Sequence, residues 1–301
     1  MKIGFILPMG ESSHIGRPPS YQEIRSLALQ AEEAGVDSVW VYDHLLYRFP
    51  DHDSMGVWEC WSMLAALADA TERVEIGTLV MPVSWRNPAL LAKMAATVDE
   101  ISNGRLILGL GTGFHRPEFE AFGYQMDHLV SRFEEGIQII RGLLKDGKVD
   151  FHGEYVSAPN CELLPRGPRP DGPPILVASA GARMLRLTAK YADAWNTAWV
   201  GNVEAIADRR AKLEEACAEV GRDPKTLDIT VGVHCAWPFD GVEFDADKVL
   251  TGSPEEVAAS LAAFEDAGVS HVICGALADV EHAYTSHVMA NMGEALAILR
   301  Q

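Results

Sequence analysis

Short apolar runs alternate with stretches of helical periodicity along the whole chain. The apolar run at residues 2–8 is followed by a loop and by Ser20, which forms a capping box with Glu23 and opens a helix that ends at Gly35. Residues 36–42 form a second apolar, β-branched run. The same junction, a helix ended by a glycine and continued directly as a strand, recurs at residues 266–272. This repetition predicts one α/β architecture rather than two unlike halves.

Eight strands are predicted in all, separated by helical stretches such as residues 89–101, 131–145 and 203–220. The strand number and the chain length predict a parallel (β/α)8 TIM barrel with insertions, as one domain over residues 1–301. A doubly wound sheet is the rival fold, favoured by the closely spaced glycines at 109, 111 and 113. Alternation around a turn predicts a small hairpin outside the ring at residues 149–156. The strands are expected at residues 2–8, 36–42, 74–81, 105–110, 174–178, 192–195, 227–234 and 269–274.

Composition and charge argue against several functional classes. The 301 residues include 25 Lys and Arg against 43 Asp and Glu, a formal net charge of −18. Such an excess of acid repels phosphate backbones and anionic lipid, so neither nucleic acid nor a membrane surface is an expected partner. No apolar run approaches the roughly 20 residues needed to cross a bilayer, and the first strand is too short for a signal peptide. The five cysteines show no metal-ligand spacing, so we expect reduced thiols, no metal and a cytoplasmic location.

The candidate chemistry lies at the carboxyl ends of the strands, where (β/α)8 barrels carry their active sites. Those positions hold small residues, aromatic residues and one titratable group that stands out, His44. A metal hydrolase would need clustered ligands there, a glycosidase two facing carboxylates, and a Schiff-base aldolase a lysine. The expected strand ends supply none of these. What remains suits an organic cofactor that carries its own reactivity.

Several motifs keep a fixed order along nearly the whole chain. They are Asp43-His44, Ile76–Val80 with Arg86-Asn87-Pro88, Ala95–Gly113, and Tyr191–Asn196. Together they resemble the bacterial luciferase-like flavin oxidoreductases, and most of all the actinobacterial branch that uses the deazaflavin coenzyme F420. The resemblance implies a (β/α)8 barrel, a flavin or deazaflavin held at the strand ends, and oxidoreductase or monooxygenase chemistry.

The same resemblance implies roles for individual residues. His44 would sit against the redox ring as the catalytic residue and move a proton, whereas the alternative is a core histidine satisfied by Asp43 or a backbone carbonyl. The relatives that bind deazaflavin have a cis peptide bond behind the ring, and the matching bond here is Leu79–Val80. The glycine run after the fourth strand would let the backbone approach a ring or ribityl chain, or would simply form a tight turn. The implied cofactor contacts are Asp43, Leu79, Val80, Met81, Gly111, Thr112, Gly113, Ser179, Ala180, Gly181, Ala182 and Arg183.

The last five of these residues open a helix, whose free N–H groups would point at a cofactor phosphate. Arg183 would add a charge to that contact or would be solvated at the surface. Aromatic residues near the strand ends are candidates for an apolar substrate pocket, although at least half of the tryptophans are expected in the core. Phe114 stands where relatives that oxidise a sugar phosphate carry a glutamate, which argues against that substrate. The substrate candidates are Trp58, Trp85, Phe114 and Trp195.

The leading interpretation is hydride transfer between F420 and a small, moderately apolar organic molecule. One alternative is an FMN-dependent two-component monooxygenase, in which a separate flavin reductase supplies reduced flavin for reaction with O2. Another is a flavin-binding barrel without turnover, against which the retained Asp43-His44 argues. The basic residues that could favour an anionic cofactor tail are Arg48, Arg86, Arg116 and Arg183. Because relatives often form dimers through helices flanking strands two and three, the segment at residues 59–70 is the expected homodimer face.

Overall fold

Eight parallel strands close into a barrel in the part of the chain that the structure describes. This computed structural model describes residues 1–11, 16–50, 52–237, 248–277 and 282–301. The strands follow the order β1, β2, β5, β7, β10, β11, β12 and β13, and β13 pairs with β1 to complete the ring. The predicted (β/α)8 barrel is confirmed, and the doubly wound alternative is wrong because the ring of described strands closes on itself. The barrel strands are β1 (Lys2–Ile6), β2 (Ser38–Val41), β5 (Glu75–Thr78), β7 (Leu106–Gly111), β10 (Ile175–Ala178), β11 (Ala194–Thr197), β12 (Asp228–Cys235) and β13 (His271–Ala276).

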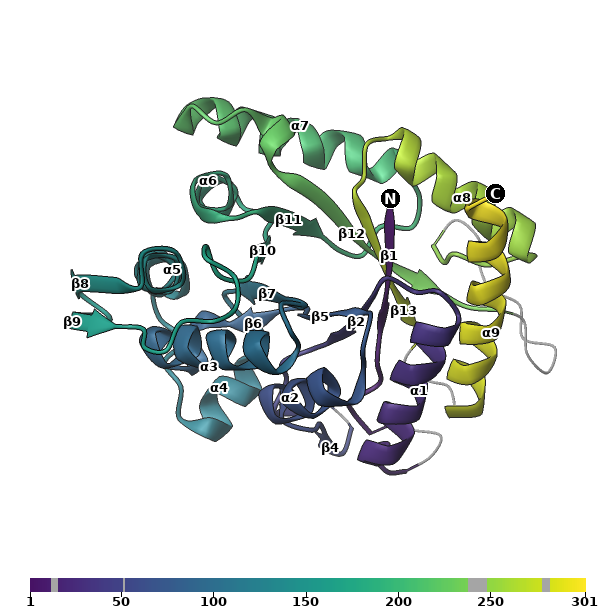
Figure 1. Cartoon of the computed structure of the whole chain (residues 1–301), viewed down its shortest axis with the longest axis horizontal. Coiled ribbons are helices and arrows are strands. Elements are labelled where there is room, and N and C mark those ends of the chain that lie inside the picture. The colour runs from purple at the N-terminus through teal and green to yellow at the C-terminus, as the bar shows by residue number, and fades with distance from the viewer. Residues whose placement is uncertain (12–15, 51, 238–247, 278–281) are drawn as a thin grey trace.

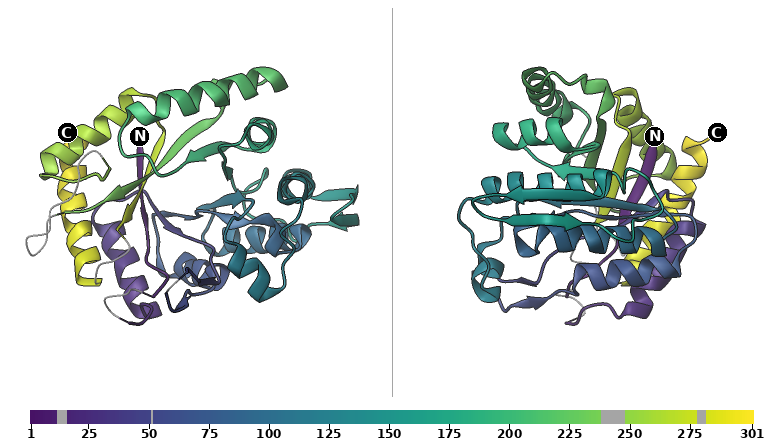
Figure 2. Two further views of the ribbon diagram at one scale, coloured as in Figure 1. Left: turned by 180° about the vertical axis from the view of Figure 1, so that it is seen from behind. Right: turned by 60° about the vertical axis from the view of Figure 1, so that its left-hand side comes forward.

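The helices lie outside the ring of strands and cover its outer face (Figure 1). Two views from other sides show the same enclosure, and in the left-hand one the hairpin β8 (Lys148–His152) and β9 (Ser157–Glu162) projects beyond α5 (Figure 2). A second hairpin, β3 (Leu46–Tyr47) with β4 (Met55–Gly56), follows β2. The helices are α1 (Tyr21–Glu33), α2 (Cys60–Ala70), α3 (Pro88–Ile101), α4 (Arg116–Phe122), α5 (Leu129–Asp146), α6 (Ala182–Tyr191), α7 (Glu204–Val220), α8 (Pro254–Asp266) and α9 (His282–Leu299).

Local sequence signals fix the helix boundaries. The Ser20 side chain accepts a hydrogen bond from the Glu23 amide, and the Glu23 side chain accepts one from the Ser20 amide, so the predicted capping box is confirmed. Gly35 and Gly268 follow α1 and α8 with φ of +88° and +77°, a conformation that favours glycine. Both predicted junctions from helix to strand are therefore present.

The observed barrel strands differ from the predicted ones by one to three residues at one or both ends. Three differences stand out, two in barrel strands and one in the hairpin. Strand β11 begins at Ala194 rather than 192, because the amide of Ala192 still donates to α6 at the Thr188 carbonyl. The predicted strand at residues 74–81 is divided into β5 and the short β6 (Met81–Pro82), and the peptide bond Leu79–Val80 between them is cis. In the hairpin, residues 153–156 form the turn, and the second strand is the largely polar β9, whose composition hides it.

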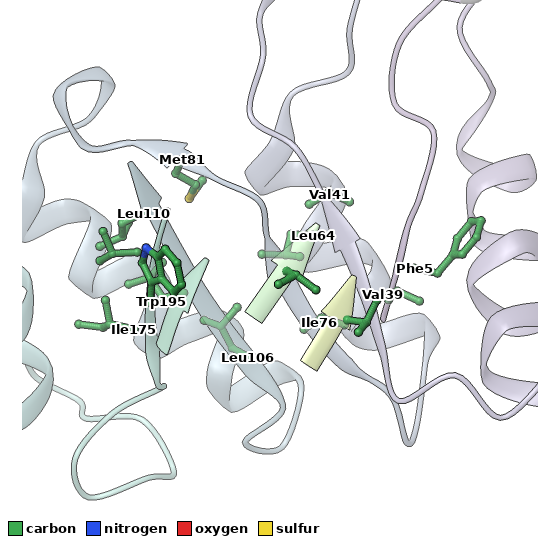
Figure 3. Close-up of a cluster of buried hydrophobic side chains, with 14 of the residues drawn as sticks. Phe5, Val39, Val41, Leu64, Ile76, Met81, Leu106, Leu110, Ile175 and Trp195 are labelled. Atoms are coloured by element: carbon green, nitrogen blue, oxygen red, sulfur yellow. The ribbon is translucent and has the colours of Figure 1, made fainter. Parts of the chain in front are cut away.

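Side chains on the outer face of the strands form the main hydrophobic core under the helices. Figure 3 shows part of this cluster, including Phe5, Val39, Leu64 and Ile76, which are at most 1% exposed. Strands that are buried on both faces read as continuous apolar runs, which explains why the sequence predicts them without showing which side faces inward.

Trp40 fills the interior of the barrel. Its indole is fully buried and packs with Ile107, Leu176 and Ile273, which come from three other strands. A Cβ atom at Gly77 would lie 2.3 Å from the Trp40 ring, and one at Gly4 would lie 2.5 Å from its Nε1 atom. Glycine is required at both positions because the ring occupies the space of their missing side chains.

A short chain of polar groups accompanies Trp40 inside the barrel. The Trp40 indole N–H donates to the Ser38 hydroxyl at 2.7 Å, and that hydroxyl also forms a hydrogen bond with Nε2 of His271 at 2.8 Å. His271 is 5% exposed, and burial, reinforced by the positive charges of Lys2 and the amino terminus, lowers its pKa to about 3. His271 is therefore neutral at physiological pH.

This buried histidine predicts a specific acid sensitivity. Between pH about 6.5 and pH about 3, the unfolded chain binds a proton at His271 and the native chain does not. The free energy of unfolding therefore falls as the pH is lowered through this range. The loss should be about 1.4 kcal/mol per pH unit in the free energy of unfolding. In urea unfolding between pH 7 and 4.5, His271→Gln should show a slope shallower by that amount. His152→Gln, at a histidine side chain 70% exposed in the β8–β9 hairpin, is the control, and equal slopes for wild type and His271→Gln would contradict the prediction.

Candidate active site

A cavity of about 660 Å³ lies at the carboxyl ends of the barrel strands. Each of the eight strands contributes to its lining at or just after its end, and the β3–β4 hairpin adds Tyr47 and Met55. The volume lies within the roughly 300–1,000 Å³ typical of small-molecule sites. Most of the lining is apolar, with a few polar groups that include His44, Glu118, Asn196 and His234. The cavity therefore occupies the place where this architecture carries its chemistry.

His44 is held by a buried carboxylate from another part of the chain. Its Nδ1 atom lies 2.9 Å from Oε2 of Glu118, a side chain that is 1% exposed and belongs to the first turn of α4. The other carboxylate oxygen, Oε1, accepts hydrogen bonds from the amides of Leu45 and Leu46 at 2.6 and 3.1 Å. Among the described residues, neither Asp43 nor a backbone carbonyl, the partners proposed from the sequence, forms a hydrogen bond with the imidazole.

The charge on Glu118 decides which nitrogen of His44 faces the cavity with a lone pair. Burial raises the pKa of Glu118, but the hydrogen bonds from His44 and from the amides of Leu45 and Leu46 outweigh it, and the pKa falls below its ordinary value. An ionised Glu118 only accepts, so Nδ1 of His44 carries a proton. A neutral imidazole then presents Nε2 as a hydrogen-bond acceptor and proton acceptor. This pair has the arrangement of a general base and its orienting carboxylate.

Sequence reasoning missed Glu118. The available signal was an acidic residue in the first turn of a helix shortly after the glycine run, but nothing in the local pattern connects it to a histidine 74 positions earlier.

Asp43, adjacent to His44, forms an ion pair with Arg86. Both of its carboxylate oxygens accept hydrogen bonds from the Arg86 guanidinium, at 2.5 and 3.1 Å. Arg86 also donates to Glu59 at 2.9 Å. Glu59 accepts from the amides of Trp61 and Ser62 and thereby caps α2. Burial raises the pKa of Asp43 even though the Arg86 charge opposes it. Asp43 lines the cavity, but its carboxylate is held by Arg86, which also contacts the cap of α2, and direct contact with a cofactor stays a prediction.

The glycine run leaves room for the chain where it breaks between β5 and β6. A Cβ at Gly109 would lie 1.8 Å from the Thr78 carbonyl oxygen, and one at Gly111 would lie 2.8 Å from the Val80 side chain. Gly113 has a φ of +75° and lines the cavity, whereas Gly111, Thr112 and Met81 do not. Leu79 and Val80 both face the cavity from the other side of this contact. Gly109 and Gly111 therefore leave room for the 79–80 segment at the cavity wall, and Leu79, Val80 and Gly113 supply the surface there.

Two of the four aromatic substrate candidates line the cavity. They are Trp85, which is 5% exposed, and Phe114, which is 76% exposed. The Phe114 ring lies edge-on to His44. Trp58 lies outside the lining, and its indole N–H donates to the Pro19 carbonyl at 2.6 Å. Trp195 is 1% exposed and is drawn among Leu110 and Ile175 in the outer core (Figure 3). Trp195 is thus a core residue, because on β11 it is the next residue, Asn196, that faces the cavity.

The segment Ser179–Arg183 lies outside the cavity lining, of which β10 supplies Ala178. Gly181 is the N-cap of α6 with an ordinary φ of −77° and, among the described residues, no side-chain capping bond and open space around its Cα. Arg183 donates to Glu134 at 2.6 Å and to Ser131 at 3.1 Å. Ala180 and Ala182 are exposed beside it. The phosphate contact expected here stays a prediction, and Arg183 already has an acidic partner.

Two further residues of the cavity lining, Trp199 and His234, form an aromatic stack. Trp199 lies parallel to His234 with ring centroids 4.3 Å apart and 9° between the planes. Burial lowers the pKa of His234. Gly275 makes room for the stack, since its Cβ would lie 3.3 Å from the Trp199 ring.

Comparison with known proteins places this site in a family. A family model described as luciferase-like monooxygenase matches residues 1–240. The chain belongs to the luciferase-like monooxygenase family. Pyrimidine monooxygenase RutA from Rhizobium rhizogenes is 33% identical over 246 residues, covering 74% of this chain and 64% of that protein. F420-dependent glucose-6-phosphate dehydrogenase from Amycolatopsis mediterranei is 29% identical over 225 residues, covering 73% and 66%.

A solved structure of similar fold is an F420-dependent secondary alcohol dehydrogenase in complex with an F420-acetone adduct. It has a TM-score of 0.80 and 20% identity, and the match covers 100% of this chain and 99% of that one. The chain spans about 64% of the length of RutA. Together the relatives support F420 or FMN as the cofactor of this luciferase-like protein.

The residues around the cavity fit such a ring. Trp85 Nε1, Asn196 Oδ1 and His234 Nδ1 are buried polar atoms without a hydrogen-bond partner in the described part of the chain, and all three residues border the cavity. The Thr230 hydroxyl donates to the Trp195 carbonyl and accepts from Nδ2 of Asn196, which leaves Oδ1 of Asn196 as a fixed acceptor. A flat heteroaromatic ring with polar edges matches apolar walls that carry a few such groups.

Two features of the described residues bear on other classes of function. No group of three or more His, Cys, Asp and Glu side chains is arranged there to hold a metal ion. No helix among the same residues has both the length and the apolar character needed to span a membrane.

The Asp43–Arg86 pair generates a stability prediction for this luciferase-like barrel. Arg86→Met should lower the free energy of unfolding by about 3–5 kcal/mol, because it leaves the Asp43 carboxylate buried without its cation. The double variant Asp43→Asn with Arg86→Met should recover part of that loss, since the stranded charge is removed. Urea unfolding at pH 7 measures both. Additive losses in the double variant would show that the two side chains do not act as a pair.

Proposed function

We propose that the protein is an oxidoreductase that transfers a hydride between coenzyme F420 and a small, moderately apolar organic substrate. The observation that carries the proposal is the His44–Glu118 pair, a base with a buried orienting carboxylate, in a largely apolar cavity beside the 79–80 segment. When bound, the deazaflavin supplies the hydride acceptor or donor. The protein would supply the position of the substrate, a dry environment and a route for the proton.

His44 would handle the substrate proton at Nε2. Glu118 fixes the tautomer and the ring orientation and stabilises the imidazolium that forms when a proton arrives. Leu79 and Val80 would support one face of the cofactor ring, and Gly113 allows close approach at its edge. Trp85, Phe114 and Trp199 would exclude water around the reacting atoms.

The backbone amides at the start of α6, from Ala182 onward, would hold the cofactor phosphate. Arg183 is paired with Glu134, so these amides rather than a free cation would carry the contact. The proposal also includes a homodimer through α2.

An FMN-dependent monooxygenase is the second candidate, and the name of one relative favours it. The RutA relative is named a pyrimidine monooxygenase and is 33% identical. Three of the four arginines expected to attract an anionic tail are paired with carboxylates: Arg86 with Asp43, Arg116 with Glu120 and Arg183 with Glu134. This pairing does not distinguish the two candidates, because FMN also carries a phosphate. The FMN-dependent candidate would need a separate reductase for its flavin. A barrel without turnover is disfavoured, because a carboxylate that orients a cavity-lining histidine has no use in mere storage.

Cofactor titration distinguishes the two candidates. Purified apo-protein should bind F420 with a dissociation constant in the micromolar range or below, with FMN at least several-fold weaker, as measured by fluorescence. Tight FMN binding without a response to F420 would reverse the assignment in favour of the monooxygenase.

A variant locates the phosphate in the same titration. Gly181→Leu should weaken cofactor binding by crowding the α6 amides, while the fold stays intact because a Cβ placed at Gly181 would meet none of the described atoms within 4 Å. Unchanged affinity in a folded Gly181→Leu protein would place the phosphate elsewhere.

Kinetics test the His44–Glu118 pair. On any alcohol or ketone of a screened panel that wild type turns over, His44→Ala should lower kcat by at least a hundredfold, within the ~10²–10⁴ range for a general acid or base. The cofactor dissociation constant should stay within about tenfold, because ring and phosphate contacts come from other strands. Glu118→Gln should cost less, and the double variant should be no slower than His44→Ala, since Glu118 acts through His44.

His115→Ala is the matched control for this series. Its ring centroid lies 6.4 Å from that of His44, but it is outside the cavity lining, and turnover should change little. Near-normal turnover of a folded His44→Ala protein would instead make His44 a structural residue, with His234 as the next candidate.

A further inference from the structure

The hydroxyl of Tyr42 is held by two backbone amides at the end of the first strand. Its oxygen accepts hydrogen bonds from the N–H groups of Met9 at 2.9 Å and Gly10 at 2.8 Å. A phenol oxygen accepts about two such bonds and carries one proton of its own. The acceptor capacity of Tyr42 is therefore filled, and among the residues that the structure describes none accepts its proton. The group can act toward a bound molecule as a donor only.

Tyr42 presents this donor inside the cavity. It follows β2 two residues after Trp40, so the alternation of the strand places it on the inner side of the barrel, and it belongs to the cavity lining. Burial raises its pKa and outweighs the two amide donors, which lower it, so the phenol keeps its proton at neutral pH. The two amides fix the position of the Tyr42 oxygen, and so they limit where its proton can lie in the cavity.

His44 offers the complementary polarity at the same end of the cavity. The ring centroids of Tyr42 and His44 lie 6.1 Å apart, and Nδ1 of His44 is committed to Glu118. Nε2 of a neutral His44 is an acceptor, whereas Tyr42 is a donor. A hydroxyl group, which donates and accepts, can satisfy both groups, and a carbonyl oxygen can satisfy Tyr42.

We propose that Tyr42 is a specificity-determining residue whose hydroxyl donates a hydrogen bond to an acceptor oxygen of the substrate. It would thereby select oxygen-bearing substrates over hydrocarbons of equal shape and fix the oxygen at the end of the cavity where His44 lies. This inference rests on the proposed function in treating the occupant of this end of the cavity as substrate. The rest of the inference depends only on the donors and acceptors around the Tyr42 hydroxyl.

Two probes of equal shape test the donor. Cyclohexanone and methylenecyclohexane differ in an oxygen replaced by a CH2 group, so only the ketone can accept a hydrogen bond from Tyr42. Binding to the full chain without cofactor is measured by ligand-observed NMR, in wild type and in Tyr42→Phe. The variant should bind cyclohexanone about three- to tenfold more weakly, the effect of one lost hydrogen bond, and methylenecyclohexane within about twofold of wild type. Comparing each probe between the two proteins cancels the difference in probe hydration.

Tyr47→Phe is the matched control. Tyr47 also lines the cavity, with its ring 6.5 Å from that of Tyr42, but none of the described backbone amides holds its hydroxyl. This variant should leave the affinity for cyclohexanone within about twofold. An equal affinity of wild type and Tyr42→Phe for cyclohexanone, or no measurable affinity in either protein, would overturn the proposal, as would an equal loss in both variants.

A second variant separates donation from support of the Met9 and Gly10 amides. Replacing Tyr42 by 3,5-difluorotyrosine keeps the oxygen but makes the hydroxyl a stronger donor, so cyclohexanone should bind more tightly while methylenecyclohexane is unchanged. Weaker binding of both probes would assign Tyr42 a structural role only. Because the probes bind without cofactor, failure of F420 and FMN to bind would count against the proposed function and leave this test intact.

Discussion

The indole of Trp40 decides where a ligand can lie in this barrel. It occupies the space that side chains at Gly4 and Gly77 would need, and it closes the interior with residues from three other strands. Three residues that pack against this cluster also line the cavity: Ile6, Leu79 and Val80. The Trp40 cluster therefore lies directly beneath the floor of the site. A barrel interior filled by layers of side chains leaves room at its mouth, and the loops after each strand then form the walls.

Electrostatic contacts across long sequence distances hold those walls in place. Glu118 joins α4 to the loop after β2 through His44 and two backbone amides, and Arg86 joins the loop after β6 to Asp43 and to the cap of α2. Each buried carboxylate has its charge met by donors, which is the condition under which burial of an ion is tolerated. The same contacts give the site its polarity, because an ionised Glu118 leaves His44 a free acceptor and the amides of Met9 and Gly10 leave Tyr42 a free donor.

The sequence predicted the parts of the fold that local signals specify. The capping box at Ser20, the glycines at 35 and 268 and the eight apolar runs all mark element boundaries within a few residues of the observed ones. It could not predict which face of a doubly buried strand points inward, so Trp195 was expected at the site, where Asn196 lies instead. Nor could spacing find Glu118, because its contact with His44 arises when the helix after β7 folds over the loop after β2. His44 itself could be singled out from its position after a strand.

The arrangement of charge bears on how an acidic protein can hold an anionic cofactor. With a net charge of −18, free cations near the cavity are scarce, and Arg86, Arg116 and Arg183 are each paired with a carboxylate. Arg48 has no carboxylate partner among the described residues; its side chain donates to Ser54 and its amide to His115. An anionic group would therefore be met by backbone N–H groups at a helix start, which need no side-chain charge and cannot be neutralised by neighbouring acids. Recognition would then depend more on the ring and its immediate contacts than on the tail, and the cavity wall formed by Leu79 and Val80 would be the main determinant of which cofactor is held.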